Sequence, residues 1–122
     1  MYVEEKKPGE DNIDEVGKIL LEAANYIERH GWCQFRLATK QGEVCARGAI
    51  RRVLDISTDE VHVLTCEEAK ALGRLLEYLG QRGLSDWNDY PGRTKAEVSF
   101  WNDYPGRTKE QVVAALRRAA RA

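Results

Sequence analysis

One stretch of nine residues, WNDYPGRTK, occurs twice in this chain of 122 residues. It opens the 14-residue unit 87–100 and again the unit 101–114, which follows without a spacer. In each copy Tyr-Pro-Gly-Arg is typical of a type II turn. The threonines that follow, Thr94 and Thr108, each stand three residues before a Glu or Gln, which is typical of a capping box. Each copy therefore predicts a turn followed by the start of a helix.

The two copies differ in what comes after them. After Thr108, apolar residues recur at helical spacing and predict a stable C-terminal helix from residue 109. After Thr94, a second Asn-Asp pair and Pro105 interrupt the pattern. We therefore expect the second copy to dock with the C-terminal helix, and the first to form an excursion on the surface. Two units are too few for a solenoid, which needs at least about three, so the repetition indicates a tandem duplication of coding sequence.

The rest of the chain predicts a single small α+β domain, mostly helical, in which a short β-hairpin packs with three to four helices. Residues 1–11 are polar and are expected to form a flexible arm, so the globular domain covers residues 12–122. The hairpin is expected over residues 32–45, because W-C-Q-F-R-L alternates and K-Q-G-E supplies a turn. Residues 55–64 are ambiguous between irregular structure and one turn of helix.

Apolar residues at helical spacing predict the remaining elements. They indicate helices over residues 12–30, 46–54 and 66–80. His30 and Gly31 supply a last-turn base and a stop for the first helix. Thr65 and Glu68 predict a capping box at the start of the third.

Composition limits the function without identifying it. Hydrophobic residues make up 43% and charged residues 32% of the chain, as in soluble globular proteins. The apolar runs are too short to span a membrane, and the polar N-terminus is unlike a secretion signal, so we expect a cytoplasmic protein. The net charge of −1 argues against a dedicated nucleic-acid binder. Nothing in the sequence indicates a cofactor.

Three short motifs carry a resemblance to a known family. They are W-C-Q at 32–34, C-A-R-G-A-I at 45–50 and W-N-D-Y-P-G-R-T in the repeat. With the helix before Gly31, they make the chain from about Ile19 onward resemble domain-of-unknown-function family 6197, small proteins of actinobacteria and their phages. The resemblance implies no activity. It implies recurrent positions at Trp32, Gln34, Cys45, Gly48 and Ala49, with Trp-Asn-Asp supplied by 87–89 or by 101–103.

Cys45 suggests an enzymatic hypothesis. A cysteine between a strand and a helix lies where backbone N–H groups and the helix dipole stabilise a thiolate. His30 or His62 would act as the base, and Asp103 or another Asn or Asp of a repeat copy would orient it. In the alternative interpretation, Cys45 is a small buried residue that fills space between the hairpin and the helix.

A zinc site is a second hypothesis. His30 and Cys33 have an H-x-x-C spacing, and Cys45 and Cys66 would complete a Cys₃His set. The chain has no C-x-x-C pair, and its three cysteines are equally explained as free thiols in a reducing compartment.

A binding site is the third hypothesis. The candidate residues are the polar and aromatic members of the W-C-Q and W-N-D motifs with the arginine of the turn: Trp32, Gln34, Trp101, Asn102, Asp103 and Arg107. In a structural interpretation they anchor the fold by Asx-turns and an indole hydrogen bond. In a functional interpretation they bind a small polar ligand or a partner. Arg47 and Arg51 share a helix face and are explained either by phosphate binding or by pairing with acids.

Together these observations predict a small intracellular binding or accessory protein of actinobacterial or phage origin that is not an enzyme. Its partner would be a protein or a small polar ligand, and homo-oligomerisation stays open. The alternative is a cysteine-dependent hydrolase or transferase that uses Cys45, His62 and Asp103.

Overall fold

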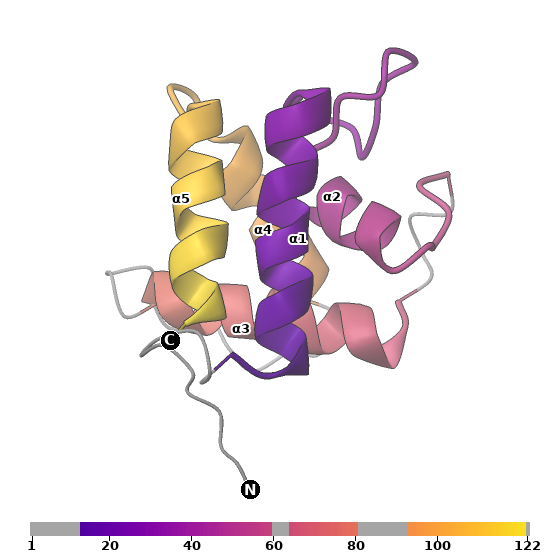
Figure 1. Ribbon diagram of the computed structural model, residues 1–122. Coiled ribbons are helices and arrows are strands. Elements are labelled where there is room, and N and C mark those ends of the chain that lie inside the picture. Colours follow the sequence, from indigo (N-terminus) through magenta and orange to yellow (C-terminus); the bar gives the residue numbers. More distant parts are fainter. Residues whose placement is uncertain (1–12, 60–63, 81–92, 122) are drawn as a thin grey trace, which may run out of the picture.

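The computed structural model describes residues 13–59, 64–80 and 93–121, with side chains from residue 97 onward in the last range. This part of the chain forms five helices: α1 (Glu15–His30), α2 (Ala46–Val53), α3 (Cys66–Gly80), α4 (Arg93–Asp103) and α5 (Lys109–Ala120). Helices α1 and α5 lie side by side and antiparallel, α3 crosses one end of the pair, and α4 lies behind it (Figure 1).

Helix α1 confirms the predicted first helix and shows how its ends are fixed. Asp14 is the N-cap, because its Oδ1 atom accepts a hydrogen bond from the Gly17 N–H at 2.9 Å. The helix therefore begins at Glu15 rather than at residue 12. It ends at Gly31, whose φ of 102° favours glycine and whose N–H donates to the Ile27 carbonyl at 2.8 Å.

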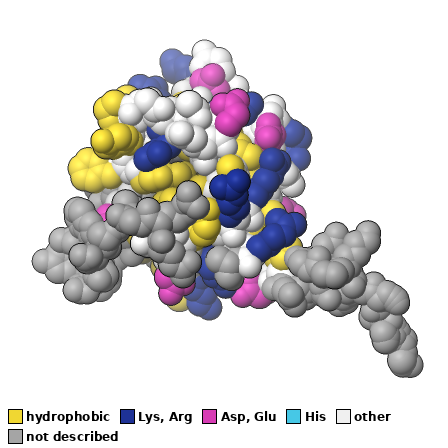
Figure 2. Space-filling view, turned by 90° about the vertical axis from the view of Figure 1, so that its left-hand side faces the viewer, with side chains coloured by type: hydrophobic (Ala, Val, Ile, Leu, Met, Phe, Trp, Pro, Cys, Tyr) yellow, Lys and Arg dark blue, Asp and Glu magenta, His cyan; other side chains and the backbone are white. Residues whose placement is uncertain are grey.

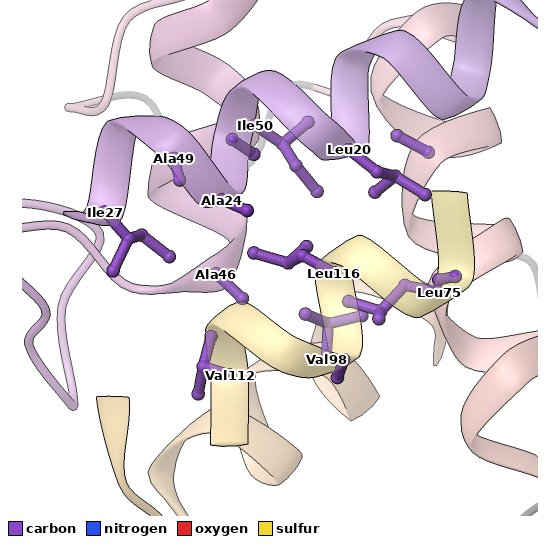
Figure 3. Packing of buried hydrophobic residues seen from close by; sticks show 14 of the residues in the cluster. Leu20, Ala24, Ile27, Ala46, Ala49, Ile50, Leu75, Val98, Val112 and Leu116 are labelled. Carbon is purple, nitrogen blue, oxygen red and sulfur yellow. The ribbon is translucent and has the colours of Figure 1, made fainter. Parts of the chain in front are cut away.

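All five helices contribute side chains to one hydrophobic core. The close view in Figure 3 shows these side chains converging from α1, α2, α3, α4 and α5: Leu20, Ala24, Ile27, Ala46, Ala49, Ile50, Leu75, Val98, Val112 and Leu116. All ten are fully buried. The five helices of the described residues therefore share one continuous core.

The predicted β-hairpin is wrong, and with it the α+β class. In the described residues, segment 32–45 makes isolated bridges only, from Val44 to Trp32 and to Ala38. The turn at Gly42 is present, with φ of 98° and its N–H bonded to the Thr39 carbonyl at 3.1 Å. The first strand fails because Phe35 has a positive φ of 71°, which turns the chain away from an extended path.

The second repeat copy forms the predicted turn and cap. The Arg107 N–H donates to the Tyr104 carbonyl at 3.0 Å, and Gly106 has the positive φ of 88° that a type II turn requires. Thr108 then caps α5 by accepting from the Gln111 N–H at 3.1 Å, and Gln111 returns a bond to the Thr108 N–H. The turn and α5 are therefore one continuous unit.

The first repeat copy differs from the prediction. Residues 87–92 lie outside the described residues, but residues 93–100 form most of α4 instead of a surface excursion. Val98 is fully buried in the core. The helix continues through the Trp-Asn-Asp of the second copy and ends at Asp103, two residues before Pro105.

Two further expectations are settled only in part. Residues 55–59 are irregular, while 60–63 and the arm over 1–11 lie outside the described residues. Thr65 caps α3 as predicted, accepting from the Glu68 N–H at 3.2 Å. The Glu68 carboxylate makes no box with Thr65, because it is buried between Arg47 and Arg51.

Candidate functional site

Asn102 is the centre of a polar junction between segments far apart in the chain. Its Oδ1 atom accepts from the Trp32 indole N–H at 2.8 Å and from the Ala46 N–H at 3.0 Å. Its Nδ2 atom donates to the Cys33 carbonyl at 3.2 Å and to Asp103 Oδ1 at 2.9 Å. An asparagine side chain has two donors and two acceptor sites, so this fully buried amide is completely satisfied. We call Asn102 with these partners the Asn102 junction.

Further hydrogen bonds join the loop that begins with W-C-Q to Asn102 and to the two residues that follow it. The Gln34 Nε2 atom donates to the carbonyls of Asn102 and Tyr104, at 3.1 and 3.3 Å. The Asp103 carboxylate accepts from the Phe35 N–H at 2.8 Å. Phe35 is thereby held at its positive φ, a conformation that costs a non-glycine residue about 1–3 kcal/mol.

Arg107 completes this group from the far side of the turn. Its Nε atom donates to the Trp101 carbonyl at 2.9 Å. Its guanidinium carbon lies 4.9 Å from the Trp101 ring centroid and 5.5 Å from that of Tyr104. The structure therefore brings together all six predicted binding residues. Their polar atoms largely serve one another, and whether they also bind a ligand stays a prediction.

The C-A-R-G-A-I motif meets this junction at the start of α2. Cys45 is the N-cap of the helix, with Sγ accepting from the Gly48 N–H at 3.3 Å. Gly48 is required by close packing, since a Cβ atom there would lie 1.9 Å from the Leu37 carbonyl oxygen. The motif thus docks α2 against the W-C-Q loop through its cysteine and its glycine.

The environment of Cys45 is unfavourable for a nucleophile. The thiol is buried, and burial raises its pKa, so that the protonated form is favoured. The nearby Asp103 carboxylate raises the pKa further. The proposed base His62 lies outside the described residues. Hydrogen bonds from the Gly48 and Arg47 backbone lower the pKa of Cys45, but burial outweighs them, so the net shift is opposite to the direction that thiolate catalysis needs.

The four predicted zinc ligands are not gathered into one site in the described part of the chain. His30 stacks on Tyr26 with ring centroids 4.1 Å apart, and Cys66 is exposed at the start of α3. Burial raises the pKa of Cys33 to about 12, and its Sγ donates to the carbonyls of Arg36 and Glu43. Among the described residues, no group of three or more His, Cys, Asp and Glu side chains is placed to hold a metal ion.

A buried ion cluster joins α2 to α3. Arg47 Nε and Arg51 Nη1 each lie 2.6 Å from one oxygen of the Glu68 carboxylate, and all three side chains are at most 5% exposed. Arg51 also donates to the Ser57 carbonyl at 2.8 Å. The helix-face pairing of the two arginines was visible in the sequence. Their partner was not, because Glu68 was assigned to the cap of its own helix.

Three exposed aromatic side chains belong to the segments that meet at the Asn102 junction, and the sequence interpretation missed them as a group. Phe35 is 76% exposed, Phe100 72% and Tyr104 62%; we call these three the aromatic surface. Phe100 lies three and four residues before Asp103 and Tyr104, which places them on one side of α4 and its end. Asp103 in turn bonds Phe35. Figure 2 shows hydrophobic side chains gathered at the upper left of one face, with Lys and Arg beside them.

One signal for this surface lay in the repeat itself. Val98 and Phe100 are two residues apart, so a helix that buries the first must expose the second. Phe35 carried no comparable signal, because an alternating strand would have turned it to the same side as the buried Leu37.

The model of a family of unknown function, DUF6197, matches residues 12–100 and 96–122. The chain belongs to this family. The two matched segments each contain one copy of the repeat, so either copy fits the DUF6197 pattern. No curated protein and no solved structure matches the chain.

The membrane expectation was tested in the same part of the chain. None of the helices in the described residues is long and apolar enough to cross a bilayer.

Proposed function

We propose that this member of DUF6197 is a non-enzymatic binding protein that recognises another protein through the aromatic surface of Phe35, Phe100 and Tyr104. The observation that carries the proposal is the combination of exposure and rigidity at this surface. Its side chains are 62–76% exposed, yet the backbone beneath two of them is fixed by the Asn102 junction. Exposed aromatic side chains on a rigid backbone are typical of the anchor residues of protein interfaces.

Backbone strain at Phe35 supports the same conclusion. A fold that needed only a turn here would favour glycine or asparagine, which adopt a positive φ at little cost. A large apolar side chain that is strained and also exposed to water contributes nothing evident to the stability of the monomer. Such outliers cluster at functional sites, where the strain is part of the mechanism.

The two other functions suggested by the sequence have less support. A small polar ligand would need donors and acceptors from Gln34, Asn102 and Asp103, but most of their polar atoms are bonded to one another and to the backbone. A cysteine-dependent enzyme would need an accessible thiolate at Cys45, whose thiol is buried and whose pKa is raised. The proposal includes a cytoplasmic location, in keeping with three unpaired cysteines, and an actinobacterial or phage origin.

The test is a crosslinking capture with matched variants. The tagged protein is incubated with lysate of the source organism, and partners are compared between the wild type and the double variant Phe35→Ala/Tyr104→Ala. The control is Lys18→Ala/Glu77→Ala, which truncates two exposed side chains on α1 and α3. We expect a partner that the wild type and the control capture and that the aromatic variant loses. Identical capture by all three proteins, with each folded by circular dichroism, would contradict the proposal.

A further inference from the structure

The charges beside the aromatic surface point to the chemistry of its partner, given that the proposed function is correct. The two segments that carry the surface, 33–41 and 99–107, contain three basic residues and one acid, a net charge of +2. The bases are Arg36, Lys40 and Arg107, of which the first two are exposed. The one acid, Asp103, already accepts bonds from the Phe35 N–H and Asn102. Glu43 and Glu97 stand just outside these two segments, so the bases next to the aromatic residues themselves are Arg36, which follows Phe35, and Arg107, which lies over Tyr104.

Arg107 is prepared to bind a carboxylate. Its Nε atom is fixed on the Trp101 carbonyl, and its guanidinium plane packs over two aromatic rings. Within the described residues, neither of its two Nη atoms makes a hydrogen bond. An arginine whose orientation is already fixed loses little side-chain entropy when its outer nitrogens grip a carboxylate. The Tyr104 ring beneath it is 62% exposed, so an apolar side chain next to that carboxylate can pack there.

Charge also distinguishes between the classes of occupant. A second copy of this chain would bring the same basic residues face to face, which opposes self-association through this surface. Nucleic acids and anionic membranes need basic residues spread along a groove or a face, together with an overall attraction. Here the base that lies against the aromatic surface is Arg107, over the Tyr104 ring, and the whole chain is slightly acidic. A short acidic protein segment fits this arrangement best.

We infer that the aromatic surface binds an acidic segment of another protein, in which an Asp or Glu carboxylate pairs with Arg107 and a neighbouring apolar side chain packs against Phe35 and Tyr104.

The experiment is a selection from a phage-displayed library of random short peptides on the immobilised full chain. We expect the selected peptides to be enriched in Asp and Glu together with aromatic or aliphatic residues. The best peptide, labelled with fluorescein, should lose at least about tenfold in affinity when its acids are replaced by Gln or Asn. Arg107→Gln should remove most of that difference, and Arg36→Gln should weaken binding with no effect on folding. Affinity should also fall between about 0.1 M and about 1 M salt, as the Debye length shortens from about 10 Å to about 3 Å.

The other outcomes separate this inference from the function on which it rests. If neutral or basic peptides bound the wild type but not Phe35→Ala, the inference of an acidic partner would be wrong. The aromatic surface would still be a binding surface. No enrichment over the Phe35→Ala/Tyr104→Ala variant would overturn both. If oligo(dT) or phosphatidylserine vesicles bound more tightly than every selected peptide, and Arg107→Gln weakened that binding, the inferred class of partner would be wrong. Thermal unfolding of Arg107→Gln, compared with Arg107→Lys, shows whether a loss of binding reflects the charge or the fold.

Discussion

At the scale of single residues, Asn102 joins the W-C-Q loop, the start of α2 and the end of α4. Asn102→Ala would leave the indole N–H of Trp32 and the Ala46 N–H without their acceptor in a buried site. Each such group costs about 1–3 kcal/mol, so we expect the free energy of unfolding to fall by about 2–6 kcal/mol. Urea denaturation measures the change. The matched control is Asn88→Ala, the same substitution in the first copy, which should cost less than about 1 kcal/mol; equal losses would show that the two copies share the junction.

A substitution at Phe35 tests binding separately from stability. Phe35→Gly removes an exposed aromatic ring and relieves the positive φ of 71°. Relief of that strain is worth about 1 kcal/mol after the extra freedom of glycine in the unfolded chain is subtracted. We expect a melting temperature equal to or above that of the wild type, together with loss of the captured partner. A clear fall in the melting temperature would show that the Phe35 ring supports the fold itself.

The cysteines are expected to differ in reactivity according to their burial. Iodoacetamide alkylates the thiolate, and burial raises the pKa of the thiols of Cys33 and Cys45. Exposed Cys66 should therefore be labelled first at neutral pH, half-buried Cys33 more slowly, and Cys45 only once the protein is unfolded. Peptide mass spectrometry of a time course measures the order. Labelling of native Cys45 ahead of Cys66 would favour the cysteine-dependent enzyme.

At the scale of elements, the packing of α2 on α3 depends on one buried carboxylate. Glu68→Gln removes the charge that balances Arg47 and Arg51, both of which stay buried. Loss of one partner from a buried ion pair costs about 3–5 kcal/mol, so we expect a destabilisation of about this size. The neighbouring Glu67 is exposed, and Glu67→Gln should change stability by less than about 0.5 kcal/mol. Similar effects of the two substitutions would contradict the role of the cluster.

Helices and their ends were largely predictable, because their signals are local. Asp14, Gly31 and Thr108 fix helix ends through bonds to residues three or four positions away. The absence of a hairpin was not predictable, because the conformation of residues 32–45 depends on partners about 70 residues along the chain. The Phe35 N–H bonds Asp103 rather than a facing strand, and Gln34 bonds the carbonyls of Asn102 and Tyr104. Alternation in the sequence carries no information about such distant partners.

The candidate site shows the same division. The motifs supplied six candidate binding residues, and the structure brings them into one group, while their binding of a ligand stays a prediction. Their spacing could not show that Asn102 would be saturated by internal bonds while Phe35, Phe100 and Tyr104 stayed exposed. That distinction depends on which side of α4 faces the core, and α4 itself was not expected.

At the scale of the whole molecule, the residues after each repeat copy explain why the last helix, α5, follows the second copy and not the first. Helix α5 buries Val113, Leu116 and Ala119. The residues 14 positions earlier, at the corresponding places after the first copy, are serine, asparagine and proline. A helix that followed the first copy and took the place of α5 would therefore put two polar residues and a helix breaker on the face that must join the core.

A matched pair of deletions tests this explanation, because removal of either unit leaves one copy. Without residues 87–100, Asp86 would directly precede Trp101, and Leu84 would stand where Val98 stands now. The fully buried position keeps an apolar residue, and the exposed position of Phe100 receives an aspartate. The DUF6197 model also matches residues 12–100 without a break, which contain one copy with this same connection. We expect this deletion to fold, with a free energy of unfolding within about 1 kcal/mol of the wild type.

The product without residues 101–114 has the same length and differs from the first at four positions only, all after Thr94-Lys95. It places Ser99 where α5 buries Val113 and Phe100 where Ala114 stands. Burial of a serine in place of a valine costs about 1–3 kcal/mol, so this product should be less stable than its counterpart by about that amount. Urea denaturation of the two proteins gives the difference directly. Equal stabilities of the two products would show that the position of the second copy is determined by something other than the helix that follows it. If the product without residues 87–100 were unfolded, α4 would need the residues of the first copy.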